Sequence, residues 1–88
     1  MDKYEYQLKT EHIRQVAARK EYAEAAKLCD TIDWTKIRDV KMLTLAADIY
    51  TAVEEYEKAI DILQQAYEYA TMGRRIVYRL TELALKAD

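Results

Sequence analysis

One histidine and one cysteine are the residues of this chain best suited to catalysis. His12 and Cys29 are the single residues of their types, and an imidazole beside a thiol can activate a thiolate nucleophile. We predict that both lie on helix faces turned toward the same helix–helix seam, where they could be neighbours. However, no orienting group accompanies them, and cysteine is among the most frequently buried residues. We therefore interpret Cys29 as a core residue and His12 as a residue with one solvent-facing edge, and we predict no enzymatic activity.

The sequence predicts neither a metal site nor a cofactor site. One histidine and one cysteine supply at most half of a zinc site. Carboxylates such as Glu54, Glu55 and Glu82 are typical of solvated helix faces. We expect no cofactor and no bound metal.

Composition limits the fold to one small helical domain. The chain has 88 residues, of which 51% are hydrophobic and 34% charged, with no proline and one glycine. This length allows one core, and the lack of proline favours continuous helices over a β-rich fold.

Charge and cysteine content exclude several classes of partner and location. The formal net charge is −2 and the basic residues are scattered, so we predict no nucleic-acid binding. No apolar run reaches the length of a membrane span, and no apolar signal region follows Met1. A single cysteine fits a reducing compartment. We predict a cytoplasmic protein that binds neither nucleic acid nor membrane.

Apolar residues recur with a helical period in two consecutive segments. Positions i, i+3, i+4 and i+7 share one helix face. The first segment carries Leu43, Ala46, Ala47 and Tyr50, and the second carries Tyr56, Ala59, Ile60, Leu63 and Ala66. Separated by a short polar break, they predict an antiparallel helix hairpin with Leu63 at the centre of the core.

The same pattern occurs 34 residues earlier. Tyr22, Ala25 and Cys29 precede Tyr56, Ala59 and Leu63 by this interval. A 34-residue period of paired helices resembles the tetratricopeptide repeat (TPR) family, in particular a small bacterial member or a fragment of one. The matching residues of the second copy are Leu43, Ala46, Ala47, Tyr50, Ala59 and Leu63. The sequence departs from the family where Lys20 and Glu54 replace the glycine between the helices.

The resemblance implies an all-α, tetratricopeptide-like α-solenoid of two helix hairpins plus a C-terminal capping helix. We expect repeat one over about 6–39, repeat two over about 40–73 and the capping helix over about 74–88. The expected helices cover 4–19, 22–30, 39–52, 55–69 and 74–87, with Asp33 and Asp39 as N-caps. We place Tyr4 and Leu8 on the apolar face of the first helix, with Ile13 and Val16.

In this family the first helix of each repeat lines a concave groove that binds peptides or partner helices. The corresponding positions here include Arg14, Lys41, Leu45, Asp48, Arg75, Tyr78, Arg79 and Glu82. The carboxylate clamp of chaperone-binding members is not reproduced, because Thr10, Asp48 and Tyr78 stand at clamp positions. We therefore predict a protein or peptide partner of another kind.

The alternative is a self-associating structural domain, or a fragment of a longer TPR solenoid with no ligand of its own. In that case the last helix would expose apolar residues such as Ile76 and Leu83, and a homodimer would bury them.

Overall fold

The computed structural model describes residues 2–70, 83, 85 and 86. Within these residues the fold is all-α, as predicted, with four α-helices, one 3-10 turn and no strand. The elements are α1 (Lys3–Ala18), α2 (Tyr22–Cys29), the 3-10 turn η1 (Trp34–Lys36), α3 (Val40–Ala52) and α4 (Tyr56–Tyr69). Most of the predicted fifth helix lies outside the described residues; Leu83, Leu85 and Lys86 are helical.

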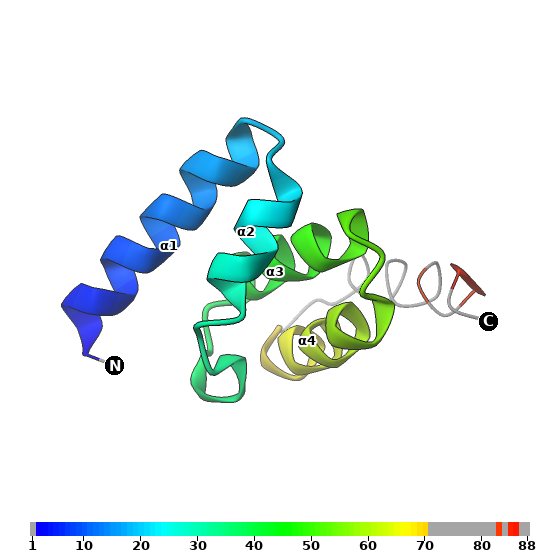
Figure 1. The fold of residues 1–88 in the computed structure, drawn as a ribbon. Coiled ribbons are helices and arrows are strands. Elements are labelled where there is room, and N and C mark those ends of the chain that lie inside the picture. The colour runs from blue at the N-terminus through cyan, green and yellow to red at the C-terminus, as the bar shows by residue number, and fades with distance from the viewer. Residues whose placement is uncertain (1, 71–82, 84, 87–88) are drawn as a thin grey trace.

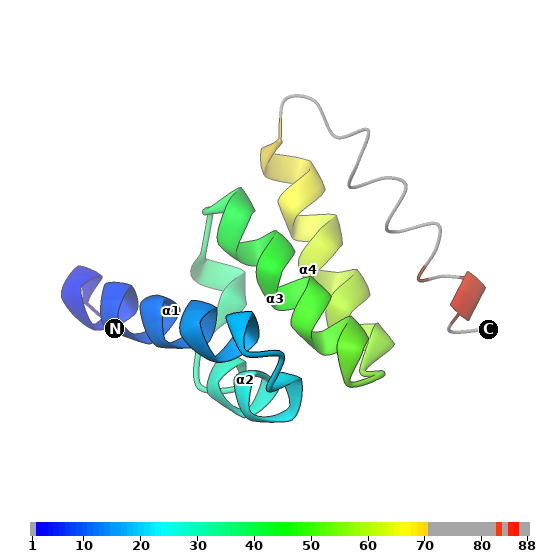
Figure 2. The same ribbon diagram turned by 90° about the horizontal axis from the view of Figure 1, so that it is seen from above.

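The helices form two antiparallel pairs. The α1–α2 pair is seen in Figure 1, and Figure 2 shows α3 and α4 side by side. α3 packs most extensively against α4 and also contacts α2, which contacts α1. α2 and α3 thus join the two pairs.

Aspartates begin three of these elements. Asp2 accepts a hydrogen bond from the Glu5 N–H at 2.8 Å, and Asp39 accepts one from the Met42 N–H at 3.3 Å. Asp33 caps η1 through the Thr35 N–H at 3.2 Å. Each carboxylate satisfies a backbone donor that the first helical turn leaves without a partner. The predicted caps Asp33 and Asp39 are therefore confirmed.

Two turns with the same backbone geometry close the helix pairs. Lys20 has φ 61° and Glu54 has φ 62°, and both are left-handed. The next N–H donates to the carbonyl five residues earlier, over 3.2 Å at Glu21 and 2.9 Å at Glu55. This hydrogen bond belongs to the Schellman motif, which usually places glycine at the left-handed position. The two turns are 34 residues apart, at the positions where the sequence lacks the expected glycines.

A single core lies between the helices. Leu63, Leu43 and Ile49 are fully buried, so the predicted central position of Leu63 is confirmed on the α3–α4 side. Ala46 and Ala59 are also fully buried, and their small side chains permit close approach of the backbones. Leu83 is only 4% exposed, so it is not part of the exposed apolar surface that the fragment alternative expects on the last helix.

The predicted face of α1 is partly wrong. Tyr4 is 70% exposed and Leu8 56% exposed, whereas Thr10 is only 4% exposed. Ile13 and Val16 are fully buried, as predicted. Since α2 is the main packing partner of α1, α1 buries one narrow face, and Tyr4 and Leu8 lie outside it.

Candidate functional site

The described residues of the predicted groove lie on α3 and, for Arg14, on α1. Lys41 and Asp48 are exposed and Leu45 is half-buried, with the i, i+4, i+7 spacing that places them on one helix face. Arg14 is exposed on α1, where its guanidinium lies 3.9 Å from the Glu11 carboxylate. The other predicted groove residues, Arg75, Tyr78, Arg79 and Glu82, lie outside the described residues. Lys41, Leu45 and Asp48 thus lie together on one face of α3.

Thr10 does not lie on an open groove wall. Its side chain is buried, and its hydroxyl donates a hydrogen bond to the Gln7 carbonyl at 3.2 Å. The burial follows from its place on the same packed face as Ile13, three residues later.

The prediction that His12 shares a packed helix–helix seam with Cys29 is wrong. Cys29 is fully buried, whereas His12 is exposed on α1. Burial, reinforced by the nearby charge of Asp30, raises the pKa of the Cys29 thiol to about 12. The thiol therefore stays protonated at neutral pH and is a poor nucleophile.

Two further features concern metal ions and membranes. Across the described residues, no three His, Cys, Asp or Glu side chains form a group that could hold a metal ion. None of the described helices combines the length and apolar character needed to span a membrane.

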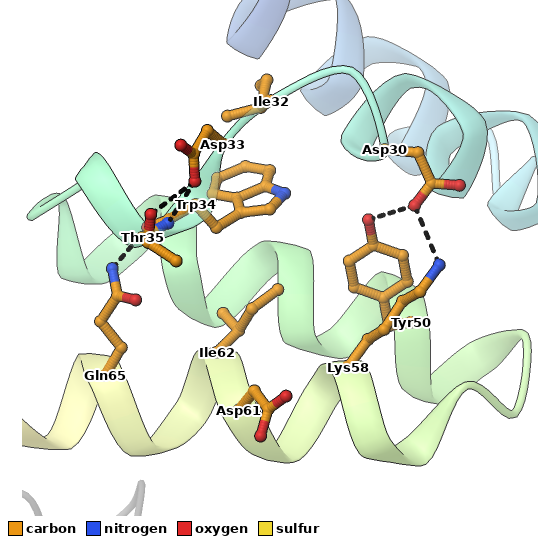
Figure 3. A pocket seen from close by; sticks show the side chains of 10 residues that line it. All are labelled: Asp30, Ile32, Asp33, Trp34, Thr35, Tyr50, Lys58, Asp61, Ile62 and Gln65. Carbon is orange, nitrogen blue, oxygen red and sulfur yellow. Dashed lines mark hydrogen bonds and ion pairs between the residues drawn. The ribbon is translucent and has the colours of Figure 1, made fainter.

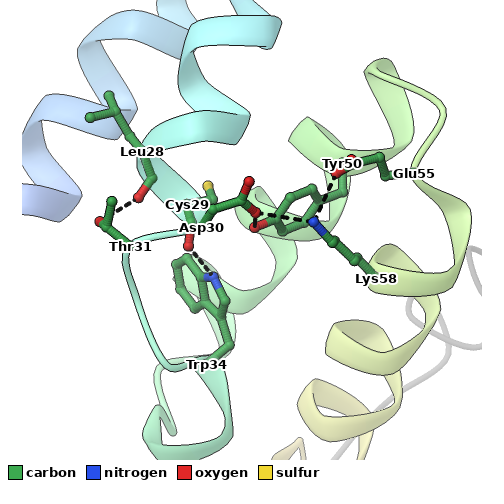
Figure 4. A network of polar contacts seen from close by, with 8 residues as sticks. All are labelled: Leu28, Cys29, Asp30, Thr31, Trp34, Tyr50, Glu55 and Lys58. Atoms are coloured by element: carbon green, nitrogen blue, oxygen red, sulfur yellow. Dashed lines mark hydrogen bonds and ion pairs between the residues drawn. The ribbon is translucent and has the colours of Figure 1, made fainter.

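A polar network joins the end of α2 to α3 and α4 (Figure 4). The Tyr50 hydroxyl donates to the Asp30 carboxylate at 2.7 Å, and the Lys58 ammonium reaches the same oxygen at 3.3 Å. Lys58 also lies 3.4 Å from the Glu55 carboxylate and 5.4 Å from the centre of the Tyr50 ring. The hydrogen bond to Asp30 is the main reason that the pKa of Lys58 is raised. Lys58 is thus held by two carboxylates.

A second set of polar contacts fixes η1 against the helices. The Trp34 indole N–H donates to the Cys29 carbonyl at 2.9 Å. The Gln65 side-chain amide donates to the carbonyls of Trp34 and Ile37, the latter at 2.7 Å. Trp34 is 8% exposed and belongs to the core cluster. The segment between α2 and α3 is therefore attached to α2 through Trp34 and to α4 through Gln65.

Between these two sets of contacts lies an open hollow of about 450 Å³. Figure 3 shows η1 on one side of it, α4 on the other and the Asp30–Tyr50–Lys58 cluster at one end. The residues that line it are Asp30, Ile32, Asp33, Trp34, Thr35, Tyr50, Lys58, Asp61, Ile62 and Gln65. We call this feature the η1–α4 hollow.

The sequence did not predict the η1–α4 hollow. Several of its polar contacts join residues 20 to 31 positions apart, as in Tyr50–Asp30 and Gln65–Trp34. Helical periodicity predicts which face is buried, but not which polar side chains meet across elements. The one available signal was Trp34, which lies between Asp33 and Asp39 in the stretch that joins the expected helices 22–30 and 39–52.

Three comparisons with known proteins were made for the chain. No protein-family model matches it, no curated protein matches it, and no solved structure matches it.

Proposed function

We propose that this chain is a protein-interaction module of the tetratricopeptide type, with its helix pairs stacked as a short α-solenoid. The observation that supports this best is the pair of left-handed turns at Lys20 and Glu54. They are 34 residues apart and are closed by the same backbone hydrogen bonds. Repeating units of this kind present an extended surface, which repeat proteins use for binding.

The binding surface in this proposal is the solvent face of α3. The proposal adds the groove residues that the sequence predicts within 75–82. Leu45 offers a half-buried apolar contact between the exposed charges of Lys41 and Asp48. Arg75 and Arg79 add positive charge in the sequence. The proposed partner is a peptide or helix with an apolar anchor, which supplies affinity, and an acidic flank, which sets register.

Peptide display against the immobilised protein, followed by affinity measurement, tests this proposal. The test variant is Leu45→Glu, and the matched control is Leu85→Glu at a leucine that is 73% exposed. We expect Leu45→Glu to lower the affinity for the selected peptides by about tenfold or more, as loss of an interface anchor does. Leu85→Glu should leave the affinity unchanged. Equal binding by wild type and Leu45→Glu would overturn the proposal.

The second candidate is a self-associating structural domain. It is favoured by the exposure of Tyr4 and Leu8 on α1 and of Leu85 near the end of the chain. Sedimentation over a range of protein concentrations separates the two functions. A dimer that dissociates on Leu8→Glu substitution would favour self-association.

A further inference from the structure

We propose that the η1–α4 hollow binds a cationic side chain, an arginine or a lysine, presented by a partner polypeptide. This site shares no residue with the α3 face formed by Lys41, Leu45 and Asp48, so the inference does not depend on the function proposed for that face. The volume of the hollow, its apolar floor and the negative charge of its rim each support the proposal.

The size of the hollow suits a side chain rather than a whole domain. Its volume of about 450 Å³ falls within the range of small-ligand sites, roughly 300–1,000 Å³. It is open along the surface between η1 and α4 (Figure 3). An occupant can therefore remain attached to a larger molecule that lies across the opening.

The floor of the hollow is apolar. Ile32, Trp34 and Ile62 line it and are between 6% and 8% exposed. Ile62 lies beneath the Trp34 ring in Figure 3. The methylene stem of arginine or lysine packs on such a surface while the charged head stays at the wet rim.

The rim has an excess of negative charge. Three aspartates but only one lysine line the hollow, and that lysine, Lys58, already pairs with Asp30 and Glu55. The hydrogen bond from the Thr35 hydroxyl lowers the pKa of Asp33, and Lys36 lies 4.0 Å from the same carboxylate. An anionic occupant such as a phosphate would meet net repulsion.

Asp61 is the carboxylate available to the occupant. It is exposed on α4 beside Ile62 and lines the hollow. Among the residues that the structure describes, none forms a hydrogen bond or ion pair with Asp61. A guanidinium or ammonium group above Ile62 would provide the missing charge partner, and guanidinium would do so with two parallel hydrogen bonds.

The probe is a capped tripeptide with arginine between two leucines, compared with the same peptide carrying neutral citrulline. Trp34 is the single tryptophan of the chain, so its fluorescence reports occupancy directly, and amide NMR shifts locate the peptide. We expect the arginine peptide to bind about two- to fivefold more tightly than the citrulline peptide at low salt. Added salt should reduce this difference.

Two charge-neutralising variants complete the test. Asp61→Asn should remove most of the arginine preference, whereas Glu24→Gln, at an exposed position of α2, should keep it. Both positions are exposed, so thermal unfolding should confirm folded variants. Equal affinity for arginine and citrulline, an unchanged preference in Asp61→Asn, or shifts confined to Lys41, Leu45 and Asp48 would each overturn the inference. The last result would leave the function proposed for the α3 face intact.

Discussion

The hydroxyl of Tyr50 connects two parts of the chain that are 20 residues apart. The ring is buried, at 2% exposure, and the hydroxyl donates to Asp30 at the end of α2. Burial, followed by this hydrogen bond, raises the pKa of Tyr50 above its ordinary value of 10.0. A tyrosine at this position thus combines core packing with a polar link between the helix pairs.

Tyr50→Phe tests this link and its pH dependence. We expect a loss of about 0.5–1.5 kcal/mol at neutral pH, the net value of one hydrogen bond. Because the folded state raises the pKa of the phenol, the hydroxyl contributes fully below about pH 10 and loses its contribution as the pH rises further. Urea titrations at about pH 8 and about pH 11 should therefore show a larger fall in the free energy of unfolding for wild type than for Tyr50→Phe. An equal fall in both proteins would contradict the assignment.

Prediction of burial from the sequence succeeded at some residues and failed at others. Periodicity predicted the burial of Cys29 and Leu63, because burial follows from the position on a helix face. It failed at His12, whose exposure depends on whether another helix covers that side of α1. The Asp30–Tyr50–Lys58 cluster was missed for a different reason: the meeting of these side chains depends on tertiary packing.

At the scale of elements, the boundaries of the four described α-helices were predicted to within one residue. The expected helices over 39–52 and 55–69 correspond to Val40–Ala52 and Tyr56–Tyr69. Capping aspartates and polar breaks mark such ends locally. The local sequence did not show that Lys20 and Glu54 adopt the left-handed conformation, because neither residue type favours it.

These two turn residues give a prediction for each helix pair. A left-handed residue with a Cβ atom costs roughly 1–2 kcal/mol. Glycine removes this strain, but part of the gain in stability is lost because the unfolded chain has more conformational freedom with glycine. We therefore expect Lys20→Gly and Glu54→Gly each to raise the free energy of unfolding by up to about 1 kcal/mol, measured by denaturant titration. Lys20→Ala is the matched control and should not stabilise. Destabilisation by both glycine variants would mean that these residues contribute through their side chains.

The packing of α4 on α3 depends on Leu63. This side chain is fully buried, so Leu63→Ala should cost about 2–5 kcal/mol through lost burial and a residual cavity. The control is Leu85→Ala, which makes the same chemical change at a leucine that is 73% exposed and should stay within about 0.5 kcal/mol. Chemical denaturation of both variants measures the difference. Similar costs at the two sites would place Leu63 outside the core.

At the scale of the whole molecule, equivalent positions of the two helix pairs have different surroundings. Leu8, His12 and Gln15 are exposed on α1. The residues 34 positions later, Met42, Ala46 and Ile49, are fully buried on α3. α3 packs against both α2 and α4, whereas α1 packs mainly against α2. Polar residues at two of the three α1 positions fit a face that the described chain leaves uncovered.

Leu8 and Met42 therefore provide a test of this difference. Met42→Ala should cost about 2–5 kcal/mol, because the side chain is fully buried. Leu8→Ala should change the free energy of unfolding by less than about 0.5 kcal/mol, since its side chain is more than half exposed. Denaturant titrations at two protein concentrations measure both effects. A large cost at Leu8 that grows with protein concentration would show that a second copy covers α1, and it would favour the self-associating domain over the interaction module.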